Sequence, residues 1–146
     1  MGSMFIEKDV QILKERLKKL TPETRPNWGT FTAGQMLCHL GDAMAVALAE
    51  PKRGVQPLSG PPMIIRHMIR RYLPWPRHIR TLPEMIVTQP GEFQKDMIRV
   101  LTYMDTMLRT RRTDWPVHAF FGPLDDVAWA RLTWRHINHH LHQFGL

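Results

Sequence analysis

The chain has 146 residues, a size that suits a single domain, and 43% of them are hydrophobic, which is enough for one sizeable core. This composition excludes a disordered tail, and the lack of any apolar run of about 18 residues predicts no membrane-spanning helix. The formal charge of +7 attracts anions, but neither RNA-binding aromatic motifs nor zinc-finger spacings occur, so we expect neither nucleic acid nor a membrane as partner.

The first letters of the chain, MGSM, are typical of a short remnant of expression in front of a natural first methionine. We therefore assign residues 1–3 to such a remnant and residues 4–146 to one domain. The start has no apolar segment of the kind that signal peptides carry. Because Cys38 is the one cysteine, an internal disulfide is excluded, and the sequence predicts a cytoplasmic protein of bacterial type.

Hydrophobic periodicity predicts two helices in the first third of the chain. Residues 5–20 carry apolar side chains at intervals of three and four, with lysine and arginine on the other face. A second helix is expected over residues 33–49, where alanine and glycine allow close packing. Thr32 is its expected N-cap, with Gln35 as the capping-box partner. Proline and glycine separate the two helices.

A long segment rich in proline precedes two further predicted helices. Residues 50–62 read as a loop, 63–73 as a short basic helix and 77–91 as irregular chain in which 84–88 could be extended. A third long helix is expected over residues 91–111. The last one begins at Leu124 and Asp125 and stops at Gly145. Four long helices without repeats predict an all-α helical bundle.

The last helix carries the most distinctive feature of the chain, a group of four histidines. His136 and His140 are four residues apart, so on a helix their Cβ atoms lie about 5–6 Å from each other on one face. This is a spacing at which two imidazoles bind one metal ion. Leu132 shares that face, which indicates that it points inward, whereas His139 and His142 are expected to point outward. An exposed run of histidines is the alternative interpretation.

His39 is the candidate third ligand. It lies in the middle of the second helix among apolar residues. A histidine in such a run can be a core residue satisfied by a hydrogen bond, or it can point at the bundle axis to bind a ligand. Bundle metal sites are built from inward side chains of facing helices. Three neutral imidazoles leave the charge of a dication intact and leave positions open, a pattern typical of catalytic sites.

Each metal-bound imidazole needs a partner for its other nitrogen. Gln35, Asp42 and Gln143 lie within about one turn of a candidate ligand, and each could equally be an ordinary polar residue. Asp42 is also the nearest candidate for a general base. Cys38 points about 100° away from His39 around the helix, so we expect a buried, inert thiol there.

Two blocks of residues resemble the DinB/YfiT-like superfamily, and more narrowly a branch of it known only as a domain of unknown function. The first block is Trp28-Gly29, Phe31-Thr32 and Gln35-Met36-Leu37-x-His39. The second block is Phe121-Gly122-Pro123-Leu124, Trp129 and His136-x-x-His139-His140-Leu141-x-Gln143-Phe144-Gly145. Their order and helical placement extend the resemblance over nearly the whole chain.

The resemblance implies an up-down four-helix bundle, here with a long Pro-rich excursion between helices two and three. It also implies a divalent metal ion, zinc or nickel first and iron or manganese as further candidates, held by His39, His136 and His140. Relatives in the superfamily include thiol-dependent S-transferases, a maleylpyruvate isomerase and hydrolase-like proteins, and many form dimers. A homodimer is therefore expected here.

Two functions remain open from the sequence. The first is a metal-dependent transferase or hydrolase that acts on a small electrophile, with a low-molecular-weight thiol as cosubstrate. Arginines between residues 66 and 80 could attract an anionic thiol, or could form an ordinary solvated face. The alternative function is a non-catalytic bundle that binds metal or takes part in stress-associated interactions.

Overall fold

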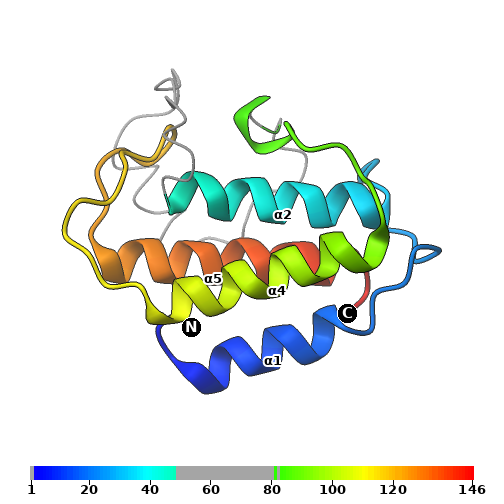
Figure 1. Cartoon of the computed structure of the whole chain (residues 1–146), viewed down its shortest axis with the longest axis horizontal. Helices are drawn as coiled ribbons and strands as arrows, with labels where there is room; N and C mark the ends of the chain where they lie inside the picture. The colour runs from blue at the N-terminus through cyan, green and yellow to red at the C-terminus, as the bar shows by residue number, and fades with distance from the viewer. Residues whose placement is uncertain (1, 49–80, 82) are drawn as a thin grey trace.

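The structure is a computed structural model that describes residues 2–48, 81 and 83–146. These residues form helices α1 (Glu7–Leu17), α2 (Ala33–Ala47), α4 (Phe93–Arg109) and α5 (Asp126–Gln143), and the 3-10 turn η1 (Pro83–Met85) (Figure 1). No strand occurs among them, so the all-α prediction is confirmed for the described part. The predicted loop 50–62 and basic helix 63–73 lie outside it. None of the described helices is both long and apolar enough to cross a bilayer.

The helix ends follow the predicted capping signals. The Thr32 hydroxyl accepts from the Gln35 N–H at 3.2 Å and the Gln35 side chain accepts from the Thr32 N–H at 2.9 Å, which confirms the capping box. The Asp125 carboxylate caps α5 by accepting from the Ala128 N–H. Gly145 ends that helix at φ 73°, a left-handed conformation that favours glycine.

Residues 84–88, which the sequence allowed to be extended, are not a strand. Pro83–Met85 form a 3-10 turn instead, and irregular chain leads from there to α4. Because Pro83 fixes its own φ near the helical value, a short helical turn is the favoured local conformation. A lone strand would also have found no partner among the described residues, which contain no other strand.

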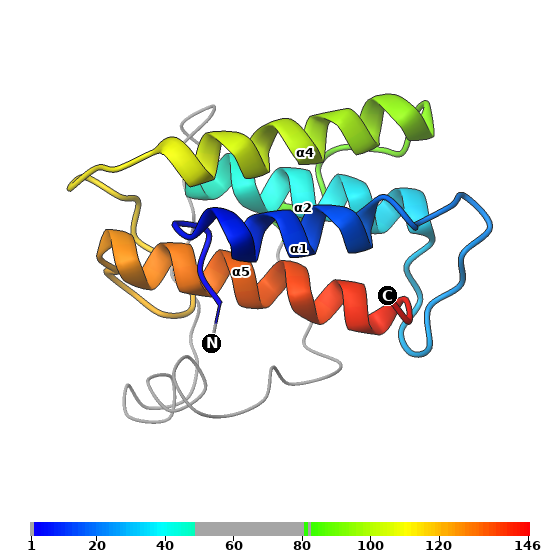
Figure 2. The ribbon, with the colours of Figure 1, turned by 90° about the horizontal axis from the view of Figure 1, so that it is seen from below.

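The four helices form a four-cornered bundle in which α1 and α2 each pack against both α4 and α5 (Figures 1 and 2). Each helix contributes one apolar stripe to the shared core, as the periodicity predicts. The stripes consist of Val10, Leu13 and Leu17 on α1, Met36, Leu37, Leu40 and Met44 on α2, Met97, Val100, Met104 and Met107 on α4, and Trp129, Ile137 and Leu141 on α5.

The directions of the helices do not alternate as in the up-down bundle that the resemblance implies. Near the start of both helices, a Cβ on Gly34 of α2 would lie 3.1 Å from the Pro90 side chain just before α4. Beyond their ends, Arg112 donates to the Leu48 carbonyl. Thus α2 and α4 run parallel, and the chain passes up, down, down and up through the bundle (Figure 1). Bundles whose neighbouring helices run parallel need a long crossover connection, and the number of residues between α2 and α4 is sufficient for one.

The N-terminal residues pack against the bundle. Gly2, Ser3 and Met4 are buried, the Ser3 N–H donates to the Asp9 carboxylate at 2.9 Å, and the Met4 N–H donates to the Ala130 carbonyl at 3.1 Å. The first bond ties the start of the chain to α1 and the second ties it to α5. The assignment of residues 1–3 to an expression remnant stays a prediction.

Candidate metal centre

The structure brings His39, His136 and His140 together where α2 and α5 face each other. The Nε2 atom of His136 lies 2.9 Å from Nε2 of His39 and 3.1 Å from Nε2 of His140. A nitrogen atom from each ring can be chosen so that all three lie within 4.8 Å of one another. The His-x-x-x-His spacing therefore places both α5 rings on the face that meets His39, as the sequence predicts.

Two of the three rings have their tautomer set by an acceptor on Nδ1. The Met85 carbonyl lies 2.8 Å from Nδ1 of His39, and a carbonyl can only accept, so this nitrogen carries the proton. Nδ1 of His140 lies 2.8 Å from Oε1 of Gln143, whose amide nitrogen donates to the Trp28 carbonyl at 2.7 Å. In their neutral forms, both rings therefore present an Nε2 lone pair to His136.

This arrangement leaves more lone pairs than protons between the three rings. A single N–H on Nε2 of His136 can serve His39 or His140, but not both. A cation between the Nε2 atoms would satisfy all of them at once. Two nitrogens bound to one zinc ion at about 2.0–2.1 Å, and about 109° apart, lie roughly 3.3–3.4 Å from each other. The observed separations of 2.9 and 3.1 Å are close to this value, so the residues fit a metal ion.

Burial keeps the three rings neutral, the form in which imidazole binds metal. His39 and His140 are 3% and 8% exposed, while His136 keeps part of its surface accessible. Burial lowers the pKa of His39, against the opposing effect of the bond to Met85. Burial and the nearby His39 lower the pKa of His140 to about 3, and burial and the other rings lower that of His136 well below its usual value.

The loop before α2 covers one side of the site. The Phe31 ring lies 5.4 Å from the His39 ring and is stacked on His140 at 6.1 Å between centroids. Gly29 has a φ of 81°, and a Cβ there would lie 2.5 Å from the Gln143 amide nitrogen, so only glycine fits. The loop and Gln143 are therefore locked together, with the Trp28 carbonyl as the point of attachment.

The histidines outside the trio behave differently from each other. His142 is exposed, as predicted. His139, which was also expected to point outward, is partly buried, and its ring packs edge-on against His140 at 5.2 Å and against Trp28 at 6.0 Å. The loop before α2 folds over this part of α5, which helical periodicity within α5 cannot reveal.

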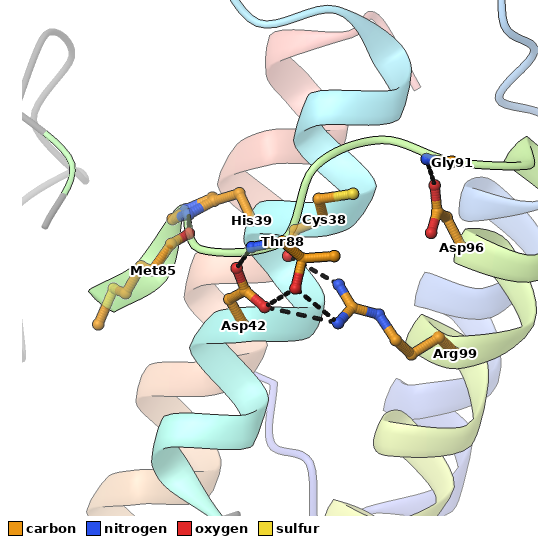
Figure 3. A network of polar contacts seen from close by, with 8 residues as sticks. All are labelled: Cys38, His39, Asp42, Met85, Thr88, Gly91, Asp96 and Arg99. Carbon is orange, nitrogen blue, oxygen red and sulfur yellow. Dashed lines mark hydrogen bonds and ion pairs between the residues drawn. The ribbon is translucent and has the colours of Figure 1, made fainter. Parts of the chain in front are cut away.

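Of the three residues proposed as partners of the imidazoles, Gln143 bonds to one of the ligand histidines, whereas the other two have different partners. Gln143 does receive the His140 proton, as proposed from the sequence. Gln35 serves the cap of α2, and the fully buried Asp42 accepts from Thr88 and lies 3.5 Å from Arg99 (Figure 3). Cys38 is buried, and burial followed by the charge of Asp96 raises the pKa of its thiol to about 11, which agrees with an inert cysteine.

Sequence reasoning missed four residues in or near the site, which are Met85, Thr88, Arg99 and His118. The Met85 carbonyl is a main-chain group and leaves no signal in the sequence. Thr88 and Arg99 act through Asp42, and the spacing of α4 alone does not reveal that partner. His118, in the connector before α5, packs its ring on Trp129 at 5.3 Å, and its Nδ1 accepts from the Phe120 and Phe121 N–H groups.

Comparisons of this chain with protein-family models, with curated proteins and with solved structures found no match. The resemblance to the DinB/YfiT-like superfamily therefore rests on the two sequence blocks and stays a prediction.

Proposed function

We propose that the protein binds a divalent metal ion through the Nε2 atoms of His39, His136 and His140, and that it is a metal-dependent enzyme of DinB-like type acting on a small electrophile. The observation that carries this proposal is the convergence of three imidazole nitrogens, two of which have their protons held on Nδ1 by Met85 and Gln143. A core histidine satisfied by one hydrogen bond would not need two like neighbours within contact distance.

Three imidazole donors suit zinc, nickel, copper and iron alike. The resemblance to the DinB/YfiT-like superfamily favours zinc or nickel, with iron or manganese as further candidates. Such an ion, when bound, lowers the pKa of a bound water or thiol and so supplies a nucleophile at neutral pH. The residues of this chain would do the rest. The imidazoles add no charge, the Phe31 ring packs against His39, and His136 is only half-buried. A thiol-dependent transferase and a hydrolase both fit this arrangement.

A second candidate function is metal binding without catalysis. Asp42, the candidate general base, is fully buried and accepts two hydrogen bonds from Thr88, which commits it to the structure of the site. In the described part of the chain, the group that could hold a metal contains histidines alone. The arginines between residues 66 and 80, which could attract a thiol, lie outside that part. The homodimer and the cytoplasmic location stay predictions.

Metal analysis of tag-free protein, purified without a nickel column, tests the proposal. We expect about one divalent ion per chain, lost in His136→Ala and retained in His142→Ala, because His142 is exposed on the same helix. The proposal fails if wild-type protein holds no stoichiometric metal or if His136→Ala keeps its full content.

Turnover assays then separate the two functions. Metal-loaded protein is offered small electrophiles with and without a low-molecular-weight thiol. Turnover that a chelator abolishes supports the enzyme, whereas binding of the same compounds without turnover supports the non-catalytic bundle.

A further inference from the structure

A short segment between η1 and α4 lies along α2 beside the three histidines. We call residues 85–91 the strap. Figure 3 shows that hydrogen bonds attach the strap to the bundle at three points. The Met85 carbonyl bonds to His39, Thr88 bonds to Asp42, and the Gly91 N–H donates to Asp96. The strap matters for the metal centre because its first residue supplies the carbonyl that receives the His39 proton.

The attachment of Thr88 to Asp42 consists of two hydrogen bonds. The Thr88 N–H donates to one oxygen of Asp42 at 2.8 Å, and the Thr88 hydroxyl donates to the other at 2.6 Å. Two bonds to two oxygens of one carboxylate fix both the position and the orientation of Thr88. Asp42 has no exposed surface, so water does not compete for these bonds.

Arg99 of α4 also takes part in this attachment. Its Nη1 donates to the Thr88 hydroxyl at 3.1 Å and lies 3.5 Å from Oδ1 of Asp42, and its Nη2 donates to the Cys38 carbonyl at 3.2 Å. The guanidinium thus bridges the strap, α2 and α4. We refer to Asp42, Thr88 and Arg99 as the clasp.

Gly41 makes room for the clasp. A Cβ at this position would lie 2.6 Å from Nη2 and 2.8 Å from Cζ of Arg99, closer than side-chain atoms approach one another. Glycine is unfavourable inside a helix because it loses the most chain entropy on folding. The close approach of the guanidinium gives a physical reason for a glycine in the middle of α2.

The spacing links the clasp to the metal centre. His39 meets Met85 and Asp42 meets Thr88, and both pairs are separated by 46 residues in the sequence. A step of three residues along α2 therefore matches a step of three residues along the strap. Holding Thr88 on Asp42 sets the register in which the Met85 carbonyl reaches Nδ1 of His39.

We propose that the clasp positions His39 for metal binding. It holds the Met85 carbonyl against His39, and the carbonyl keeps the proton of His39 on Nδ1, so that the lone pair on Nε2 can bind the metal ion. The inference rests on the proposed function in so far as it concerns a metal ligand. Without the Met85 carbonyl, no acceptor would hold the proton on Nδ1 of His39. The proton could then move to Nε2, where it would occupy the lone pair that binds the metal ion.

Thr88→Val tests this inference, because valine has nearly the shape of threonine and lacks the hydroxyl. Thr88→Ser keeps the hydroxyl and should therefore bind metal like the wild type. Thr102→Val is the matched control, since Thr102 lies exposed on α4 and bonds only within its own helix. Arg99→Gln weakens the clasp from the other side and provides a second variant should Thr88→Val fail to fold.

Two readouts are needed. Competition with a chromogenic chelator gives the zinc dissociation constant, which we expect to rise about 10- to 100-fold in Thr88→Val and to stay within about threefold of wild type in Thr88→Ser and Thr102→Val. The imidazole ¹⁵N chemical shifts of His39 in metal-free protein report its tautomer. We expect the Nδ1–H form in wild type and a mixture with the Nε2–H form in Thr88→Val.

The two readouts separate this inference from the proposed function. If wild-type protein binds no divalent metal ion, the proposed function fails, and the tautomer of His39 in Thr88→Val still decides whether the clasp positions the ring. The inference is overturned if His39 keeps the Nδ1–H form in Thr88→Val, or if zinc affinity falls equally in Thr88→Val and Thr88→Ser.

Discussion

Gln143 offers the sharpest test of how the site is held, because one side chain joins a candidate ligand to the loop that covers it. Its Oε1 accepts from Nδ1 of His140 at 2.8 Å, and its Nε2 donates to the Trp28 carbonyl at 2.7 Å. Gln143→Leu removes both bonds while keeping nearly the same volume. The change therefore leaves the packing intact and isolates the hydrogen bonds.

The magnitude follows from burial. Gln143 is 6% exposed and His140 is 8% exposed, so water cannot readily replace the lost partner. A buried polar group left without its partner costs about 1–3 kcal/mol. The His140 N–H and the Trp28 carbonyl would together cost about 2–6 kcal/mol if both were fully buried. Because Trp28 is only half-buried, water replaces part of what its carbonyl loses, and the free energy of unfolding should fall by about 2–4 kcal/mol. For a domain of this size, that lowers Tm by about 5–15 °C.

Urea and thermal unfolding of metal-free protein, followed by circular dichroism, measure this effect. Gln94→Leu is the matched control, because Gln94 is exposed on α4 and should change stability by less than about 0.5 kcal/mol. If Gln143→Leu unfolds with the same free energy as Gln94→Leu, the two hydrogen bonds do not hold the loop to α5, and the assigned tautomer of His140 loses its support.

Two further predictions follow from buried titratable groups. Burial lowers the pKa of His118 from 6.5 to about 4, so between these values the unfolded chain binds more protons at this residue than the folded one. The stability that neutral His118 contributes is therefore complete above pH 6.5 and falls by up to about 1.4 kcal/mol per pH unit as the pH drops. His118→Asn should reduce the slope of the pH profile of urea unfolding, to which the three histidines of the metal centre also contribute, and His142→Asn should not. An unchanged slope in His118→Asn would contradict the assigned burial. Burial also raises the pKa of Cys38 to about 11, so iodoacetamide at pH 8 should label the folded protein roughly a hundredfold more slowly than the urea-unfolded chain, as followed by mass spectrometry. Equal rates would mean that the thiol is accessible.

The three histidines could be found from the sequence because their signals are local. His136 and His140 lie one turn apart on a strongly periodic helix, and His39 lies inside an apolar run, so each inward direction follows from helix geometry. The capping box at Thr32 and the stop at Gly145 are local in the same sense. Such features depend on neighbours within four residues and carry over into the fold.

What could not be predicted depends on contacts between distant segments. The Met85 carbonyl receives the His39 proton, but every residue carries a carbonyl, so no residue type marks it. The parallel pairing of α2 and α4 leaves no mark in the sequence, because a long connection allows neighbouring helices to run either parallel or antiparallel. Gln35 and Gln143 were both candidate partners of an imidazole, and only the fold shows that Gln143 receives the proton of His140 while Gln35 is held in the predicted capping box.

His39 and His136 are 97 residues apart in the chain, although their Nε2 atoms are 2.9 Å apart in the fold. In an unfolded chain, joining them would close a loop of this length at a cost of about 4.7 kcal/mol in chain entropy. An ion held by all three rings would therefore find only the His136–His140 pair once the helices separate. Release of the metal to a fluorescent indicator would then report global unfolding, with no label attached to the protein.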